Sequence, residues 1–216
     1  MMNPIDFRKT SHIIFFAAFL PALSFGAGWL CAELIPNAPF WVETLSPLAA
    51  YALLYSAFDR FAWHWPIWRK LGIVTMPDVR GRWLGEQISS HRDKNGKNRK
   101  ARVIMEIEQT FSSIHTMTYY RNWNSQQTAT TFMKVGNDCA LVTFFESEPK
   151  VHYDGDAEAH KGYMRLIQLP DTTLEGSYIN AAGRSGELTF RRTRYTLHRT
   201  FNSVGGNASS KGKSSK

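Results

Sequence analysis

The sequence predicts two N-terminal transmembrane helices followed by a small antiparallel β-barrel of about eight strands. Two apolar stretches fill much of residues 1–75, whereas the rest of the chain alternates apolar and polar residues in short runs separated by turn residues. The excess of basic over acidic residues also changes at this boundary. Residues 1–75 hold five Lys/Arg and four Asp/Glu, so the chain totals of 26 and 18 leave 21 and 14 in residues 76–216. We therefore expect a membrane region at 1–75, a cytosolic β domain at 76–201 and a disordered basic tail at 202–216.

The first predicted helix covers Ile13–Ala32, a stretch without a formal charge. About 20 apolar residues are enough for a helix to cross the hydrocarbon core of a bilayer. Arg8 and Lys9 precede the stretch, and the positive-inside rule therefore predicts a cytoplasmic N-terminus. The segment Glu33–Pro39 follows with two prolines that cannot continue a helix, which predicts a short outer loop.

The second predicted helix is organised around the apolar stretch Leu45–Phe58, which ends at Asp59 and Arg60. The tryptophan-rich segment Phe61–Trp68 comes next, and two cations follow it, a pattern typical of a helix end where lipid gives way to cytoplasm. We therefore expect a multi-pass protein of the cell inner membrane whose N-terminus and β domain are cytoplasmic. Asp59 and Arg60 are either interfacial anchors or functional ionisable groups.

Other interpretations of the N-terminal region are open. A cleaved signal peptide could end near Ser24–Gly26, although the apolar run continues beyond that point. A lipoprotein anchor at Cys31 is disfavoured by the two bulky residues before it. Two buried helices of a soluble domain are disfavoured because apolar residues surround each helix and leave no polar stripe. Since Cys31 and Cys139 fall on opposite sides of the predicted boundary, we expect no disulfide and a reducing compartment.

Short alternating runs predict the strands of the β domain. In one of them Val103, Met105 and Ile107 are apolar and acidic residues fall between them, so this strand has one packed face and one wet face. Closing such strands into a barrel removes exposed edges and leaves an interior for side chains or one small ligand. The predicted strands are Gly81–Ser89, Ala101–Gln109, Ile114–Tyr120, Thr128–Val135, Ala140–Glu146, Tyr163–Leu169, Thr173–Asn180, Gly186–Arg192 and Tyr195–Arg199.

Motifs for catalysis are missing from the sequence. It contains no GxSxG, HExxH, P-loop or paired CxxC, so we expect no enzyme, no metal and no cofactor. The one enzyme-like cluster is His152–His160, whose alternate residues could hold a divalent metal if the segment were extended. Its glycine and its density of charge favour a solvated loop instead.

Two other groups of residues point to an anionic ligand. The loop His91–Arg102 places six cations around an Asn-Gly turn, and it could contact anionic lipid, steer a phosphate, or do neither. A second set combines guanidinium groups for phosphates, aromatic rings for stacking on bases, and Asn or Thr for base edges. The candidate ligand-binding residues are Arg82, Trp83, Tyr119, Trp123, Thr131, Tyr178, Asn180, Arg184 and Arg191.

The order of these features resembles a known family. Two closely spaced apolar spans and a tryptophan-rich boundary precede a β domain that opens with Gly81–Gly85 and closes with Gly176–Asn180 and Gly186–Arg192. This arrangement resembles the two-helix, β-barrel effectors of CBASS anti-phage defence.

The resemblance implies a function for each region. The barrel would be the receptor for a cyclic dinucleotide, and ligand binding would drive oligomerisation, disruption of the inner membrane and death of the infected cell. The implied partners are the cyclic dinucleotide, membrane lipid and further copies of the chain, and no DNA or RNA polymer. Two alternatives remain: a membrane-tethered, lipocalin-like barrel for an apolar ligand or lipid, and an enzyme built on His152 and His160.

Overall fold

The computed structural model describes residues 14–34, 40–92, 95–136, 138–150, 159–169, 172–199 and 201. These residues form two compact units. The first contains the described residues up to 79 together with segments 108–114 and 131–140, and the second contains the remainder of the β domain. The predicted tail at 202–216 and most of the candidate metal segment lie outside the described residues.

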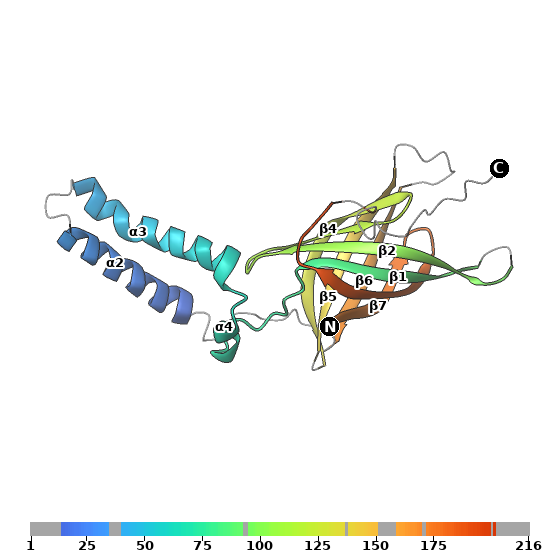
Figure 1. The fold of residues 1–216 in the computed structure, drawn as a ribbon, viewed down its shortest axis with the longest axis horizontal. Coiled ribbons are helices and arrows are strands. Elements are labelled where there is room, and N and C mark those ends of the chain that lie inside the picture. Colours follow the sequence, from blue (N-terminus) through green and yellow to red (C-terminus); the bar gives the residue numbers. More distant parts are fainter. Residues whose placement is uncertain are drawn as a thin grey trace, which may run out of the picture. The chain divides into compact units, whose positions relative to one another are not determined.

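The N-terminal region is a helical hairpin, as expected. A π-helical turn, η1 (Phe15–Phe19), leads into α2 (Leu20–Leu34), and α3 (Phe40–Ala57) runs back beside it and continues into a second π-helical turn, η2 (Phe58–Ala62) (Figure 1). A short helix, α4 (Pro66–Lys70), follows. Within the described residues, none of the helices reaches the combination of length and apolar character that crossing a bilayer requires.

Aromatic side chains pack at the base of this hairpin. The Phe58 ring is buried, with its centroid 5.2 Å from that of Phe15 and 5.2 Å from that of Phe111 in the 108–114 turn. The backbone oxygen of Asp59 accepts a hydrogen bond from the Phe111 amide at 3.0 Å, and its Oδ1 accepts one from the Ser112 amide at 2.8 Å. Asp59 therefore holds the turn, and Trp63, predicted at a lipid interface, is fully buried.

The β domain is a closed antiparallel barrel, which confirms the predicted fold. Each strand pairs with its neighbours in the chain, and β8 pairs with β1 to close the sheet. The strands are β1 (Gly81–Arg92), β2 (Asn98–Gln109), β3 (Ile114–Tyr119), β4 (Trp123–Val135), β5 (Asp138–Pro149), β6 (His160–Leu169), β7 (Thr173–Asn180) and β8 (Ser185–Arg194).

One predicted strand is wrong. Residues 195–199 form no strand, because the amides of His198 and Arg199 bond to the side chain of Glu106 and Arg199 has a positive φ of 52°. The other differences concern length: β4 begins five residues earlier than expected, and β1 and β2 extend further into the basic loop.

The interior of the barrel is packed over part of its length. Trp83, Met105 and Phe190 point inward from β1, β2 and β8, and all three side chains are fully buried. A Cβ at Gly85 would lie 2.4 Å from the backbone oxygen of Thr189 and 2.5 Å from the Phe190 ring, so only glycine admits that ring. The packed part leaves the opposite end of the barrel for a cavity.

Candidate functional site

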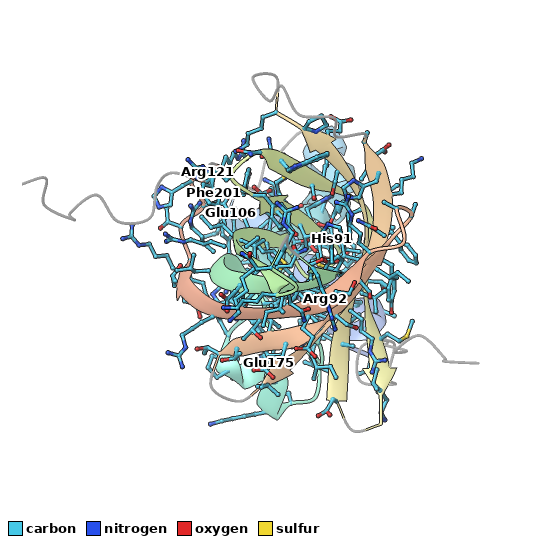
Figure 2. All side chains as sticks on the ribbon, turned by 90° about the vertical axis from the view of Figure 1, so that its right-hand side faces the viewer. His91, Arg92, Glu106, Arg121, Glu175 and Phe201 are labelled. Atoms are coloured by element: carbon cyan, nitrogen blue, oxygen red, sulfur yellow. The ribbon has the colours of Figure 1, made fainter. Side chains whose placement is uncertain are left out.

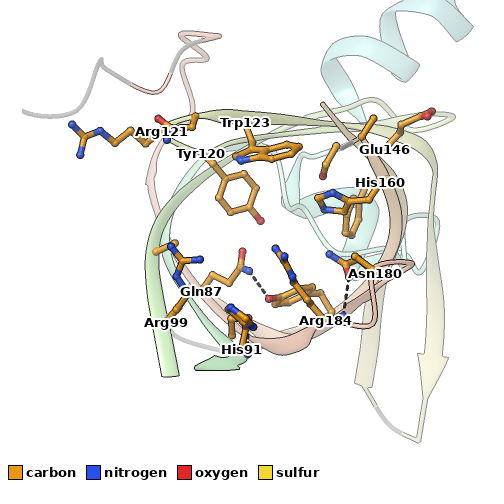
Figure 3. A pocket seen from close by; sticks show the side chains of 18 of the residues that line it. Gln87, His91, Arg99, Tyr120, Arg121, Trp123, Glu146, His160, Asn180 and Arg184 are labelled. Atoms are coloured by element: carbon orange, nitrogen blue, oxygen red, sulfur yellow. Dashed lines mark hydrogen bonds between the residues drawn. The ribbon is translucent and has the colours of Figure 1, made fainter. Parts of the chain in front are cut away.

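A cavity of about 1490 Å³ opens at the end of the barrel where the odd-numbered strands finish and the even-numbered strands begin (Figure 3). This volume exceeds the roughly 300–1,000 Å³ of pockets for drug-sized ligands. Strands β1, β2, β4, β5, β6 and β7 contribute residues to the wall, together with the turns at this end. The described lining residues are Gln87, Ser89, His91, Arg99, Lys100, Ala101, Arg102, Tyr120, Arg121, Asn122, Trp123, Phe145, Glu146, Ser147, Ala159, His160, Lys161, Tyr178, Asn180, Ala181, Ala182, Arg184 and Phe201.

The charge of the lining is strongly positive. Six Lys or Arg residues face one acidic residue, Glu146, among the described lining residues. The two lysines that pair with acids do so on the surface, Lys100 with Glu86 at 3.7 Å and Lys161 with Glu146 at 4.0 Å. Four arginines make no ion pair within the part of the chain that the structure describes; these are Arg99, Arg102, Arg121 and Arg184. A cavity with this balance concentrates anions.

Aromatic rings form part of the wall. Tyr120 and Trp123 project into the cavity from the same side, and His160 and Arg184 point in from other parts of the wall (Figure 3). The ring centroids of Trp123 and His160 lie 5.4 Å apart. Burial, with a smaller contribution from Tyr178, raises the pKa of the Tyr120 hydroxyl. Tyr120 is therefore neutral at physiological pH and offers both a flat ring and a hydroxyl to a ligand.

Polar groups lie deeper, beside the packed part of the barrel. The Gln87 Nε2 atom donates a hydrogen bond to the Tyr178 hydroxyl, and the Gln87 Oε1 atom has no partner among the described residues. Buried amide oxygens are normally satisfied, so this one is available to a donor on a ligand. A second, much smaller cavity of about 10 Å³ is lined by Tyr120 and Tyr178 together with Met164 and Leu188.

The β7–β8 turn places Arg184 at the rim. Asn180 Oδ1 accepts a hydrogen bond from the Arg184 amide at 3.0 Å, and the Asn180 amide donates to the Arg184 carbonyl at 2.9 Å. The Ala181 amide also donates to the Lys161 carbonyl at 2.8 Å. These hydrogen bonds hold the turn against the end of β6. The backbone of Arg184, from which the guanidinium extends, is therefore held in place.

Four of the predicted site residues line the cavity: Trp123, Tyr178, Asn180 and Arg184. The other five do not. Arg82 is buried in an ion pair with Glu106, Trp83 belongs to the packed interior, Tyr119 is buried outside the cavity, and Thr131 and Arg191 are exposed elsewhere.

The prediction missed Gln87, Tyr120, Arg121 and His160. Tyr120 and Arg121 are adjacent to Tyr119, and only the parity of β3 shows which tyrosine faces inward. The basic loop provided a signal for Arg99, because phosphate steering was one interpretation of that loop. His160 was considered only as a metal ligand, and the described residues contain no cluster suited to a metal.

The family model of the Cap15 cyclic dinucleotide receptor domain matches residues 74–192. The chain belongs to this family. The matched segment contains the Cap15-type barrel apart from the last two residues of β8, and it includes the cavity residues from Gln87 to Arg184. Phe201 lies beyond it. No curated protein matches the chain.

Proposed function

We propose that this chain is the cyclic dinucleotide receptor of a CBASS anti-phage system and that the cavity at the end of its barrel holds the ligand. The observation that carries the proposal is the joint presence, in one large cavity of a Cap15-type domain, of aromatic rings and of arginines that have no ion pair among the described residues. A cyclic dinucleotide has two phosphates and two bases. Guanidinium groups suit the phosphates and aromatic faces suit the bases.

The lining residues divide into groups by the part of the ligand that they fit. Arg99 and Arg184 suit the phosphates, and the rings of Tyr120 and Trp123 suit stacking. The free Gln87 oxygen fits an amino group on a base. A lipocalin-like carrier would present an apolar lumen, and the six cations of this cavity favour an anionic ligand over an apolar one.

The helical hairpin is proposed to act in the inner membrane. Large apolar side chains on its helices are exposed, including Trp29 at 69%, Leu34 at 73% and Leu53 at 72%. Apolar surface of this kind is usually covered by lipid or by another protein. In this proposal, the ligand favours an assembled state because it binds that state more tightly, and the assembled hairpins disrupt the membrane and kill the infected cell. The chain acts as a binding protein in this scheme, without an enzymatic step.

The first test is the binding of cyclic di-AMP, cyclic di-GMP and cyclic GMP–AMP to the full chain by calorimetry. Arg184→Ala removes one charge-assisted hydrogen bond, worth about 1.5–3 kcal/mol, so the Kd should rise about 10- to 100-fold. Arg191→Ala is the matched control, because Arg191 lies on β8 outside the cavity and is exposed.

The same pair of variants tests the cellular effect. Expression with a nucleotide cyclase should be toxic for the wild type and for Arg191→Ala, and harmless for Arg184→Ala at equal protein level in the membrane fraction. Absence of binding by the wild type to all three ligands would contradict the proposal. An equal loss of affinity or of toxicity in both variants would also contradict it.

A further inference from the structure

The segment after β8 leads to the cavity without forming a helix or strand. We call residues 195–199 together with Phe201 the C-terminal strap. It lies outside the segment that matches the receptor family. Figure 2 shows Phe201, Arg121 and Glu106 labelled on the same side of the barrel. The strap therefore connects a buried site on the outer face of the barrel with the rim of the cavity.

The buried site is the carboxylate of Glu106. Its Oε1 accepts a hydrogen bond from the His198 amide at 2.8 Å, and its Oε2 accepts one from the Arg199 amide at 2.9 Å. Arg82, its cross-strand partner, donates from Nη1 to Oε1. The Arg82 and Glu106 side chains are only 1% and 3% exposed.

Such a buried ion pair is stable only when its remaining hydrogen-bonding capacity is used, and here two strap amides use it. Arg199 adopts a φ of 52°, which is unfavourable for a residue with a side chain. The hydrogen bond from the Arg199 amide to the Glu106 carboxylate compensates for that cost. The strap is consequently held at a defined point by charge-assisted bonds.

The other end of the strap forms part of the cavity wall. The Phe201 ring lines the cavity, and Lys150 Nζ lies 5.6 Å from its centroid. The same Nζ donates hydrogen bonds to the carbonyls of Tyr120 at 2.9 Å and Arg121 at 3.0 Å. Phe201 therefore stands beside the turn that carries the Tyr120 ring and the Arg121 guanidinium.

We propose that the C-terminal strap completes the receptor site: Phe201 contacts the ligand as a stacking face at the cavity mouth, and Glu106 is the positioning residue that holds the strap there. This inference rests on the proposed function, because it assigns Phe201 a contact with the same nucleotide.

The binding test uses the full chain and whichever of cyclic di-AMP, cyclic di-GMP and cyclic GMP–AMP the wild type binds most tightly. Phe201→Ala should raise the Kd about 5- to 150-fold, the range seen when a stacking residue is removed, and Phe201→Trp should keep the wild-type value. Phe144→Ala is the matched control, since Phe144 is 51% exposed and next to Phe145 but outside the cavity, and it should leave the Kd unchanged. Equal affinity of Phe201→Ala and wild type overturns the inference, while failure of the wild type to bind contradicts the proposed function.

The role of Glu106 is tested by a double-mutant cycle. Glu106→Gln should weaken binding, and because it acts through Phe201, the loss should largely disappear in the Phe201→Ala background. A purely structural role would give additive losses and would overturn the assignment of Glu106.

Hydrogen exchange on the ligand-free wild type tests the anchoring of the strap directly. It needs no ligand, and it does not depend on whether a Glu106 variant folds. The amides of His198 and Arg199 should exchange at least tenfold more slowly than expected for an unstructured peptide. Exchange at the unprotected rate would show that the strap is not anchored and would overturn the proposal.

Discussion

At the scale of single residues, the direction in which a side chain points from the barrel wall decided whether it lines the cavity. Tyr119 and Tyr120 are neighbours with similar chemistry, yet Tyr120 lines the cavity and Tyr119 is buried outside it against Glu106. Burial, followed by the Glu106 carboxylate, raises the pKa of the Tyr119 hydroxyl. It therefore stays protonated and donates a hydrogen bond to that carboxylate. Tyr119 thus contributes to the anchor of the strap, and Tyr120 to the proposed ligand site.

Cys139 provides a prediction at this scale. Burial raises the pKa of its thiol to about 11, and the thiolate is the reactive form. In a Cys31→Ser background, iodoacetamide should modify Cys139 slowly at pH 8, and the rate should rise about tenfold per pH unit until the pH approaches 11. The alkylation rate measured by mass spectrometry checks this, with unfolded protein as the control. Modification at pH 8 as fast as in unfolded protein would contradict it.

At the scale of elements, close contact between strands limits what side chains the barrel accepts. Gly85 on β1 faces the Phe190 ring of β8, with which it is paired. In Gly85→Ala the new Cβ would meet the backbone oxygen of Thr189 at 2.4 Å, and backbone cannot move away as a flexible side chain can. We expect a loss of about 1–3 kcal/mol in the free energy of unfolding, typical of an overpacked interior.

Thermal unfolding followed by circular dichroism measures this loss. Gly26→Ala is the control, because no atom lies within 4 Å of its added Cβ and alanine favours a helix by about 1 kcal/mol over glycine. The melting temperature should fall for Gly85→Ala and not for Gly26→Ala. An unchanged melting temperature for Gly85→Ala would show that β1 and β8 are less closely packed than the structure has them.

At the scale of the whole molecule, the positive charge of the β domain is concentrated where the proposed ligand enters. Six cations line the cavity, and salt screens such a field with a Debye length of about 10 Å at 0.1 M. Raising NaCl from 50 to 500 mM should weaken binding of the cyclic dinucleotide by about tenfold, mainly through a slower association rate.

Stopped-flow kinetics over this salt range separates the association rate from the dissociation rate. Arg121→Ala should flatten the salt dependence, because it removes one of the cations at the mouth, whereas Arg191→Ala should not. Affinity that is independent of salt would point to recognition of apolar groups and would favour the lipocalin-like alternative.

The amino-acid sequence by itself determined the architecture of this protein. Alternating apolar residues and turn residues predicted an antiparallel barrel of about eight strands, because this pattern is local and repeats along the chain. Two apolar stretches likewise predicted the helical hairpin, and the structure shows helices in both. The resemblance to CBASS receptors also agreed with the Cap15 family match.

Only the tertiary structure decided which polar residues share a cavity. Gln87 on β1, Tyr120 just after β3 and Arg184 just before β8 are far apart in the sequence. They meet because closure of the barrel brings the ends of these strands to the same rim. Arg82 looked like a phosphate ligand, but it is neutralised by Glu106 under a segment more than 100 residues away. Local patterns define the two faces of a strand, whereas long-range pairing determines what each face meets.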